Sequence, residues 1–385
     1  MKKSKKKSKT IRYGIIGFGA HAEQCYAVML LEAKAVENAT ITAITEPNPV
    51  RRKAMQPNYD KSIKWFSDYK DMLNKKYIDA IIITSPHPFH CEMVIECLKR
   101  NIPVMCEKPA ATCTKDVLKM IEASKNSKAL FGMMFNQRTN CLYRKCREMI
   151  KDGAIGEIRR INWVITNWFR ADKYYKVAPN RATWAGEGGG LIINQACHQV
   201  DLLQWIVDEM PIKVHGFLGC GKWHDIECDD EFTLVLDYKN GSSGTFISST
   251  GEYPGVNRLE ISGTKGRLTV QNNELTYYEL ETDSRVFSIE AKGAYDLPKY
   301  TIHKIQTDGK NPQHRGIIQN FTNALLGKEK LEIPGSEGLK AIEIINAAIY
   351  SYWHNSNEVT IPIDPETYYE ELQHRIAISR YSIRK

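Results

Sequence analysis

The sequence predicts a two-domain α/β protein: a doubly wound parallel sheet, then an α+β domain with a large, mostly antiparallel open sheet. Residues 11–135 alternate short apolar runs with amphipathic segments, which is typical of a parallel sheet covered by helices on both faces. From about residue 155 strand-like segments follow one another, with a hairpin signal at Asn240-Gly241. The length of 385 residues is enough for two hydrophobic cores.

The expected elements are short and closely spaced. In the first domain we expect strands over 11–16, 39–45, 79–84, 103–106 and 129–134, and helices over 23–31, 68–73, 89–100 and 115–126. In the second we expect strands over 158–169, 213–219, 231–238, 244–249, 258–262 and 266–271, and helices over 191–207, 314–326, 337–354 and near the end from 368. We divide the chain into a disordered Lys-rich tail (1–10), a first domain (11–135) and a second domain (136–385).

Composition excludes several classes of protein. The formal net charge is +8, but six lysines lie within the first nine residues, so the remainder is close to neutral and nucleic-acid binding is not expected. No apolar run is long enough to span a membrane. Ten scattered cysteines without a Cys-x-x-Cys pair favour the cytoplasm. The Cys220, His224 and Cys228 spacing matches no zinc pattern, and no metal site is expected.

A glycine-rich turn follows the first expected strand and precedes a helix. Gly17 allows the tight turn, Gly19 lets the backbone approach a pyrophosphate, and the small Ala22 lets the helix pack against the strand. The helix N-terminus then offers N–H groups and a positive dipole end to an anion. This Gly-x-Gly-x-x-Ala arrangement predicts a dinucleotide site.

An acidic residue ends the second expected strand. Glu46 can accept hydrogen bonds from both hydroxyls of an adenine ribose and would repel a 2′-phosphate, so NAD is favoured over NADP. Arg51 and Arg52 nearby could accommodate a 2′-phosphate, and Glu46 could instead be an ordinary loop carboxylate. NADP therefore stays open as the less favoured cofactor.

Two further segments lie at the carboxyl ends of strands, where ligands bind in such sheets. Ser85-Pro86 and His90 follow one strand, and Glu107-Lys108-Pro109 follows the next. An amine beside an oxidised nicotinamide and partly removed from water would lose its proton more readily, which suits Lys108 to proton transfer.

Five motifs in this order resemble the Gfo/Idh/MocA family of oxidoreductases. They are Gly17-Phe18-Gly19-Ala20-His21-Ala22, Ser85-Pro86 with His90, Glu107-Lys108-Pro109, Asn136-Gln137-Arg138, and Trp184 with Gly188-Gly189-Gly190 through His198. The resemblance covers nearly the whole chain after the tail. It implies a Rossmann domain that binds NAD (11–135), a substrate-binding and oligomerisation domain (136–385), and oxidation of a hydroxyl group of a sugar, cyclitol or related compound.

The resemblance also implies roles for individual residues. By this resemblance, Lys108 and His198 are expected to form the acid/base pair. The cofactor contacts are expected from Gly17, Phe18, Gly19, Ala20, His21, Glu46, Ser85, Pro86, His90, Glu107, Lys108 and Trp184. Many family members carry Asp four residues before the histidine, where this chain has Asn194. An amide cannot take a proton, so Asn194 is expected to orient the substrate or the histidine.

The expected helix 191–207 supports a substrate role for this region. At about 100° per residue, Asn194, His198 and Asp201 fall on one face, opposite an apolar face. Asp201 is a candidate for holding the imidazole in one tautomer. The expected substrate contacts are Lys108, Arg138, Trp168, Tyr174, Asn194 and His198. Trp168 and Tyr174 are included because sugar C–H faces stack on aromatic rings.

Several functions remain open. The favoured one is an NAD-dependent oxidoreductase that forms a keto-sugar from a glycoside or nucleotide sugar, for example at C3. The alternatives are a redox-neutral enzyme that eliminates, epimerises or cleaves a sugar while retaining NAD, an inositol dehydrogenase, and a non-catalytic NAD- and sugar-binding sensor. An open sheet with one apolar face favours a homodimer or homotetramer.

Overall fold

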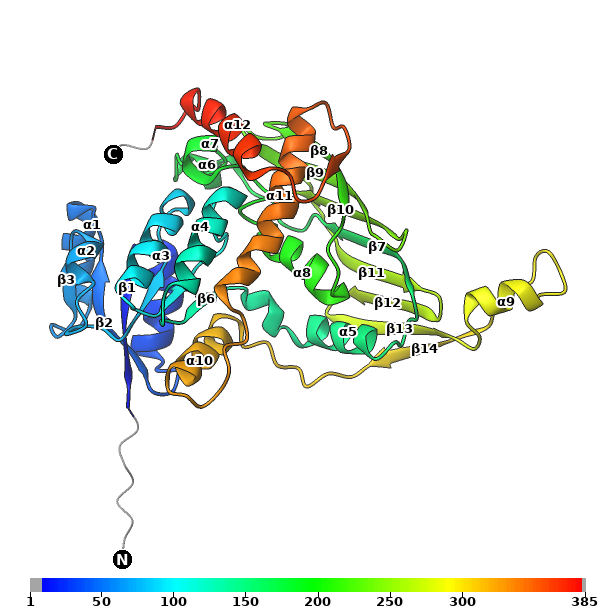
Figure 1. Ribbon diagram of the computed structural model, residues 1–385, viewed down its shortest axis with the longest axis horizontal. Helices are drawn as coiled ribbons and strands as arrows, with labels where there is room; N and C mark the ends of the chain where they lie inside the picture. Colours follow the sequence, from blue (N-terminus) through cyan, green and yellow to red (C-terminus); the bar gives the residue numbers. More distant parts are fainter. Residues whose placement is uncertain (1–8, 383–385) are drawn as a thin grey trace, which may run out of the picture. The chain divides into compact units, whose positions relative to one another are not determined.

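The computed structural model describes residues 9–382, which form two compact units, each built from separate segments of the chain (Figure 1). Unit 1 contains the chain up to Ala111, Lys115–Asn136 and Pro312–Leu339. Unit 2 contains Thr112–Thr114, Gln137–Asn311 and the chain from Lys340 onward. The sequence suggested a single boundary near residue 135. In the structure, however, unit 2 includes the short segment Thr112–Thr114, and unit 1 includes the late segment Pro312–Leu339. The expected disordered tail lies almost entirely outside the described residues.

Unit 1 is built on a six-stranded parallel sheet; the sequence predicted the parallel sheet and five of its strands, but not β3. The strand order is β3-β2-β1-β4-β5-β6. The strands are β1 (Ile11–Ile16), β2 (Ala39–Thr45), β3 (Lys64–Phe66), β4 (Ala80–Ile83), β5 (Val104–Cys106) and β6 (Phe131–Met133). Every residue of β4 and β5 is buried, because helices cover a parallel sheet on both faces.

The helices of unit 1 follow its strands in sequence. They are the π-helix η1 (Ala22–Glu32), α1 (Pro49–Met55), α2 (Tyr69–Met72), α3 (His90–Lys99), α4 (Thr114–Lys125) and α10 (Gln313–Leu325), with single 3₁₀ turns at Gln56–Asn58, His87–Phe89 and Gly335–Glu337. Helix α10 belongs to this core although it lies far along the chain. Its Thr322 hydroxyl lies 2.8 Å from the Tyr13 hydroxyl of β1, and Phe321 is fully buried.

Unit 2 contains a nine-stranded mixed sheet that is mostly antiparallel. Its order is β14-β13-β12-β11-β7-β10-β9-β8-β15, and β7 and β10 are its parallel pair. The strands are β7 (Ile158–Ile165), β8 (Lys213–Cys220), β9 (Asp229–Asp237), β10 (Ser243–Ser249), β11 (Asn257–Gly263), β12 (Gly266–Gln271), β13 (Glu274–Leu280), β14 (Tyr300–Ile305) and β15 (Val359–Thr360). The predicted hairpin between β9 and β10 is confirmed, and Gly241 supplies its positive φ of 82°.

The helices of unit 2 are α5 (Cys141–Lys151), α6 (Asp172–Lys176), α7 (Trp184–Glu187), α8 (Cys197–Val207), α9 (Ser284–Glu290), α11 (Gly338–Trp353) and α12 (Pro365–Ala377), with a 3₁₀ turn at Asn136–Thr139. Helix α8 corrects one prediction, since it begins at Cys197 and not at Leu191. The Asp229 carboxylate accepts the N–H groups of Gly190 and Ile192, at 2.9 and 2.7 Å. These bonds hold residues 191–196 in turns against β9.

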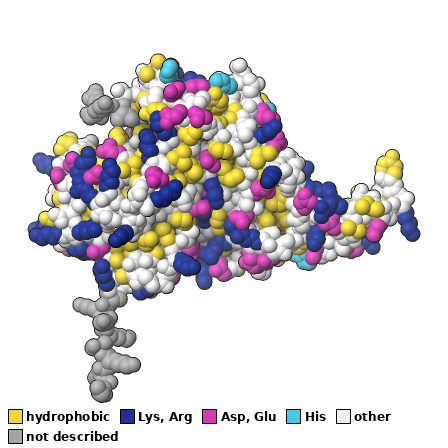
Figure 2. All heavy atoms as spheres, viewed as in Figure 1, with side chains coloured by type: hydrophobic (Ala, Val, Ile, Leu, Met, Phe, Trp, Pro, Cys, Tyr) yellow, Lys and Arg dark blue, Asp and Glu magenta, His cyan; other side chains and the backbone are white. Residues whose placement is uncertain are grey.

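The surface shows mixed charge and one apolar extension. Figure 2 shows acidic and basic side chains interspersed over the visible face. Helix α9 and the segment after it form an arm beyond β13 and β14 (Figure 1). Its exposed apolar side chains are Val286, Ile289, Tyr295 and Leu297, and Tyr300 and Ile302 of the adjoining β14 are also exposed. Within residues 9–382, no helix combines the length and apolar character needed to cross a membrane.

Candidate active site

The glycine-rich turn joins β1 to η1 in unit 1. Gly17 has a φ of +87°, and a Cβ there would lie 2.9 Å from the Ser85 Cα, so only glycine fits. At Gly19, by contrast, a Cβ would meet no described atom within 4 Å. The exposed Gly19 and Ala20 leave room for a ligand beside the first turn of η1. This turn therefore fits a dinucleotide pyrophosphate.

The Phe18 side chain is placed differently from the expected cofactor contact. It is fully buried and packs edge-to-face on Tyr59 and Trp65, with ring centroids 5.5 and 5.4 Å away. Its carbonyl oxygen accepts a 2.6 Å hydrogen bond from Arg51 Nε. Phe18 thus anchors the turn to the core, and only its backbone borders the exposed side.

Glu46 follows β2 directly, and its side chain is 9% exposed. One carboxylate oxygen accepts the Asn48 N–H at 2.9 Å, and the other lies 3.8 Å from Arg51 Nε. Arg51 also reaches Glu23 of η1 at 3.1 Å. The carboxylate predicted to select the ribose is therefore held by α1, which starts at Pro49.

His90 connects the loops that follow β4 and β5. Its ring nitrogens lie 2.8 Å from the carbonyl oxygens of Ser85 and Pro109, and the ring is fully buried. Burial lowers the pKa of His90, and the two carbonyl contacts oppose this effect. Instead of offering its side chain to a cofactor, as expected, His90 fixes the loop that carries Lys108. Pro86, in the other loop, is exposed.

Glu107 is the centre of a buried polar cluster. Its carboxylate accepts the Tyr26 hydroxyl at 2.6 Å and the Lys108 N–H at 3.1 Å, and it lies 2.9 Å from His21 Nε2 and 3.5 Å from His314 Nε2. Burial alone would raise the pKa of Glu107, but hydrogen bonds from the two histidines hold it well below its usual range.

The cluster fixes the start of the Glu107-Lys108 segment, so the half-buried Lys108 is presented from a rigid backbone at the carboxyl end of β5. Sequence reasoning missed two of its members. Tyr26 reads as an ordinary helix residue, and His314 lies more than two hundred positions away along the chain, so neither carries a local signal.

In unit 2, His198 is the second residue of α8 and is half-buried. Asn194 lies in the preceding turns, and its amide nitrogen donates to Glu187 at 2.8 Å. The other Glu187 oxygen accepts the Ala182 N–H at 2.9 Å. Glu187, which the sequence did not single out, therefore orients the Asn194 amide.

Arg138 and Asp201 form a buried ion pair. Arg138 Nε and Nη2 donate to the two Asp201 oxygens at 2.7 and 2.5 Å, and both side chains are less than 10% exposed. The guanidinium also lies 5.5 Å from the Trp205 ring centroid. Asp201, expected to serve the imidazole of His198, thus holds Arg138, the expected substrate contact.

The three aromatic candidates occupy different surroundings within unit 2. The Tyr174 ring has the guanidinium groups of Arg170 and Arg181 at 5.1 and 4.1 Å from its centroid, and its hydroxyl accepts a hydrogen bond from Gln195 at 3.2 Å. Trp184 is 9% exposed and packs on Trp353 beside a cavity of about 450 Å³. Trp168 is half-buried.

Comparison with known proteins agrees with this architecture. Residues 11–135 match the family described as "Oxidoreductase family, NAD-binding Rossmann fold", and residues 143–269 match the "GFO/IDH/MocA C-terminal domain". The myo-inositol 2-dehydrogenase of Thermotoga maritima is 27% identical over 273 residues, covering 68% of this chain and 75% of that protein. The 2,7-anhydro-N-acetylneuraminate hydratase of Escherichia coli is 26% identical over 278 residues, covering 69% and 68%.

A solved structure shows the same similarity in three dimensions. The crystal structure of the WlbA dehydrogenase from Chromobacterium violaceum, in complex with NADH and UDP-GlcNAcA, superposes with a TM-score of 0.78 at 26% identity. The match covers 92% of this chain and 97% of that one. With both family matches and the two sheets in place, the chain belongs to the GFO/IDH/MocA family of oxidoreductases, whose first domain is an NAD-binding Rossmann fold.

Proposed function

We propose that this protein moves a hydride between a hydroxyl-bearing carbon of a sugar and the nicotinamide of NAD. The preferred substrates are glycosides or nucleotide sugars, and C3 is the favoured position. The observation that carries the proposal is the placement of Lys108: it follows Glu107 and β5, and His90 ties its loop to the loop after β4. The similarity to an inositol dehydrogenase and to a UDP-GlcNAcA-bound dehydrogenase supports the substrate class.

The proposed reaction removes a hydride and a proton from one CH–OH group of the substrate. When bound, NAD supplies the hydride acceptor. Lys108 and His198 are the proposed acid/base pair, and one of them takes the hydroxyl proton as the C–H hydride leaves, giving a keto-sugar. Asn194, held by Glu187, cannot exchange a proton and would orient the substrate through hydrogen bonds.

NAD is the proposed cofactor in preference to NADP, because the Glu46 carboxylate directly follows β2 and would repel a 2′-phosphate. Replacing Glu46 by Ala removes its negative charge and leaves Arg51 and Arg52 beside the site. We expect the preference for NAD over NADP, measured as the ratio of dissociation constants, to fall at least tenfold. Glu23→Ala, which removes the other carboxylate paired with Arg51, is the matched control and should retain the preference. An unchanged ratio in Glu46→Ala would contradict the assignment.

The catalytic proposal is tested with a panel of UDP-sugars, glucosides and inositols, following NADH absorbance. Lys108→Ala should lower kcat by roughly 10²–10⁴-fold while NAD binding persists, because the general acid/base is lost and the cofactor turn is intact. Lys99→Ala, an exposed lysine at the end of α3, should behave as wild type. Turnover that is undiminished in Lys108→Ala would overturn the role.

A redox-neutral reaction is the second candidate, because one of the relatives is named a hydratase. In that reaction the sugar is oxidised, altered by elimination, epimerisation or bond cleavage, and reduced again on the same NAD. Protein that is purified with NAD already bound and converts a sugar without accumulating NADH would favour this candidate. Accumulation of one NADH per product would favour the dehydrogenase.

We also propose a homodimer or homotetramer, supported by the apolar side chains exposed on the arm around α9. The cytoplasm is the proposed compartment, supported by ten scattered cysteines without a Cys-x-x-Cys pair.

A further inference from the structure

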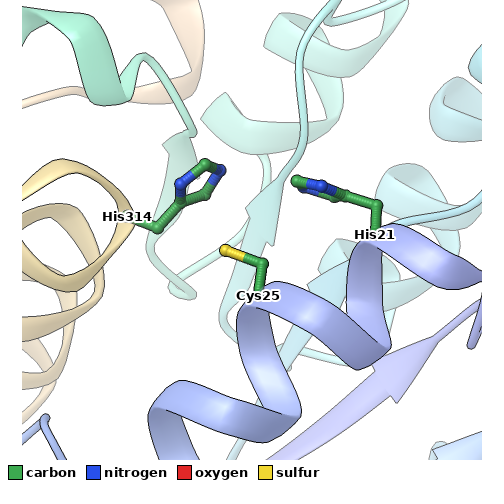
Figure 3. A group of neighbouring side chains, drawn as sticks. All are labelled: His21, Cys25 and His314. Carbon is green, nitrogen blue, oxygen red and sulfur yellow. The ribbon is translucent and has the colours of Figure 1, made fainter.

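Three metal-binding side chains converge in unit 1, although the sequence predicted no metal site. His21 directly precedes η1, Cys25 lies one turn further along that helix, and His314 is the second residue of α10. Figure 3 shows the three side chains pointing toward one another from these two helices. One ligand atom from each lies within 4.8 Å of the other two.

The donor set indicates the class of cation. Two imidazole nitrogens and a thiolate sulfur suit zinc and similar borderline divalent ions, whereas magnesium and calcium require oxygen ligands. We propose that His21, Cys25 and His314 bind a zinc-class divalent cation.

The spacing of the ligand atoms fits such a site after a small closure. Zinc lies about 2.0–2.1 Å from nitrogen and about 2.3 Å from sulfur, so ligand atoms of a tetrahedral site lie roughly 3.3–3.8 Å apart. The present separations, up to 4.8 Å, require movements of roughly 1 Å, which rotation of the side chains provides. His21 is able to move, because its side chain is 53% exposed.

Glu107 adds a negative charge beside the proposed cation site. Its Oε1 atom lies 2.9 Å from His21 Nε2 and 3.5 Å from His314 Nε2, so a carboxylate faces both imidazole ligands. Together the Glu107 carboxylate and a Cys25 thiolate carry two negative charges, which match a divalent cation.

The experiment uses full-length reduced protein treated with a chelator and titrated with Co²⁺, a coloured substitute for Zn²⁺. A sulfur-to-cobalt charge-transfer band should appear, saturate at one ion per chain, and disappear when Zn²⁺ is added. Cys25→Ser should lose the band. Cys141→Ser is the matched control, since Cys141 is also half-buried at the start of a helix, and it should keep the band.

His314→Gln should weaken Co²⁺ binding at least tenfold, because loss even of an outer-sphere partner typically costs 10–100-fold in affinity. His21→Gln should do the same, and its exposed side chain makes this the variant expected to fold normally. A thermal unfolding curve for each variant checks the fold. The proposal is overturned if no saturating band forms, if the band survives Cys25→Ser, or if folded His21→Gln binds Co²⁺ as wild type does.

Discussion

Gly17 and Gly19 are two residues apart, yet different constraints act on them. Gly17 combines a positive φ of +87° with backbone atoms of Ser85 at 2.9 Å from any added Cβ. Gly17→Ala should therefore lower the free energy of unfolding by roughly 1–3 kcal/mol, as strained backbone positions do. Chemical denaturation measures this loss.

Gly19→Ala is the matched variant. An added Cβ meets no described atom within 4 Å, so the free energy of unfolding should stay within about 0.5 kcal/mol of wild type. NAD affinity should nevertheless fall, because the methyl group occupies the path by which the pyrophosphate approaches the backbone. Equal NAD affinity in Gly19→Ala and wild type would show that the pyrophosphate lies elsewhere.

At single residues, the sequence was most informative where local backbone geometry alone determines which residue fits. The turn at Gly17 follows from local geometry and is confirmed by its φ of +87°, whereas the role of Gly19 toward a pyrophosphate stays a prediction. The role of His90 could not be predicted, because its two carbonyl partners come from loops that only the folded sheet brings together. The same holds for the contact between Glu107 and His314, which joins distant parts of the chain.

At the level of elements, the link between β9 and the glycine-rich turns before α8 depends on Asp229. Burial raises the pKa of Asp229 to about 6, from 3.8. Between these values the folded state binds more protons than the unfolded state, so this group's stabilisation is complete below about pH 4 and is lost as the pH rises through 6. The full effect is at most roughly 3 kcal/mol, at 1.36 kcal/mol per unit.

We expect the free energy of unfolding of wild type to fall more steeply between pH 4 and 7 than that of Asp229→Asn, which cannot titrate. Urea denaturation at each pH gives both curves. Asp364→Asn, at the exposed N-terminus of α12, is a control for a general effect of removing a carboxylate. Parallel curves for wild type and Asp229→Asn would contradict the assignment.

A second link between elements is the ion pair of Arg138 with Asp201 in α8. Asp201→Ala leaves a buried guanidinium without this carboxylate and should cost about 3–5 kcal/mol of stability. Replacing both residues, as in Arg138→Met with Asp201→Leu, should restore most of the loss, since neither charge then remains buried. A double variant no more stable than Asp201→Ala would show that the pair is not the cause.

Hydrophobic periodicity identified most helices and strands. It failed where tertiary contacts determine whether a segment is a helix or a strand and where it begins. Strands β1 and β2 end where expected, because their apolar runs are continuous. Helix α8 starts six residues later than predicted, because residues 191–196 form turns in which the Ala196 N–H bonds to the Leu191 carbonyl, five residues back. Strands β13 and β14 were not predicted, because their polar and aromatic residues are ordered by pairing with neighbouring strands.

For the whole molecule, the arm around α9 carries the prediction about assembly. Ile289 and Leu297 are 86% and 82% exposed, and removing them from water requires a partner surface. Replacing both with Ser should shift the molar mass measured by light scattering toward the monomer, without lowering the melting temperature. Val50→Ser, at an exposed position in α1, should leave the mass unchanged. An assembly that persists in the double variant would exclude the arm as its interface.

The interleaved segments of unit 1 have a consequence for how the protein is made. Tyr13, in the first strand, contacts Thr322, and Met133 in the last strand bonds to the Ile333 carbonyl. A ribosome must therefore synthesise the chain through Leu339 before the nucleotide-binding half can close its core. Until then, the apolar surfaces of β1 and β6 that this segment covers stay exposed to water. We therefore expect chaperones to bind the nascent chain mainly during that interval of translation.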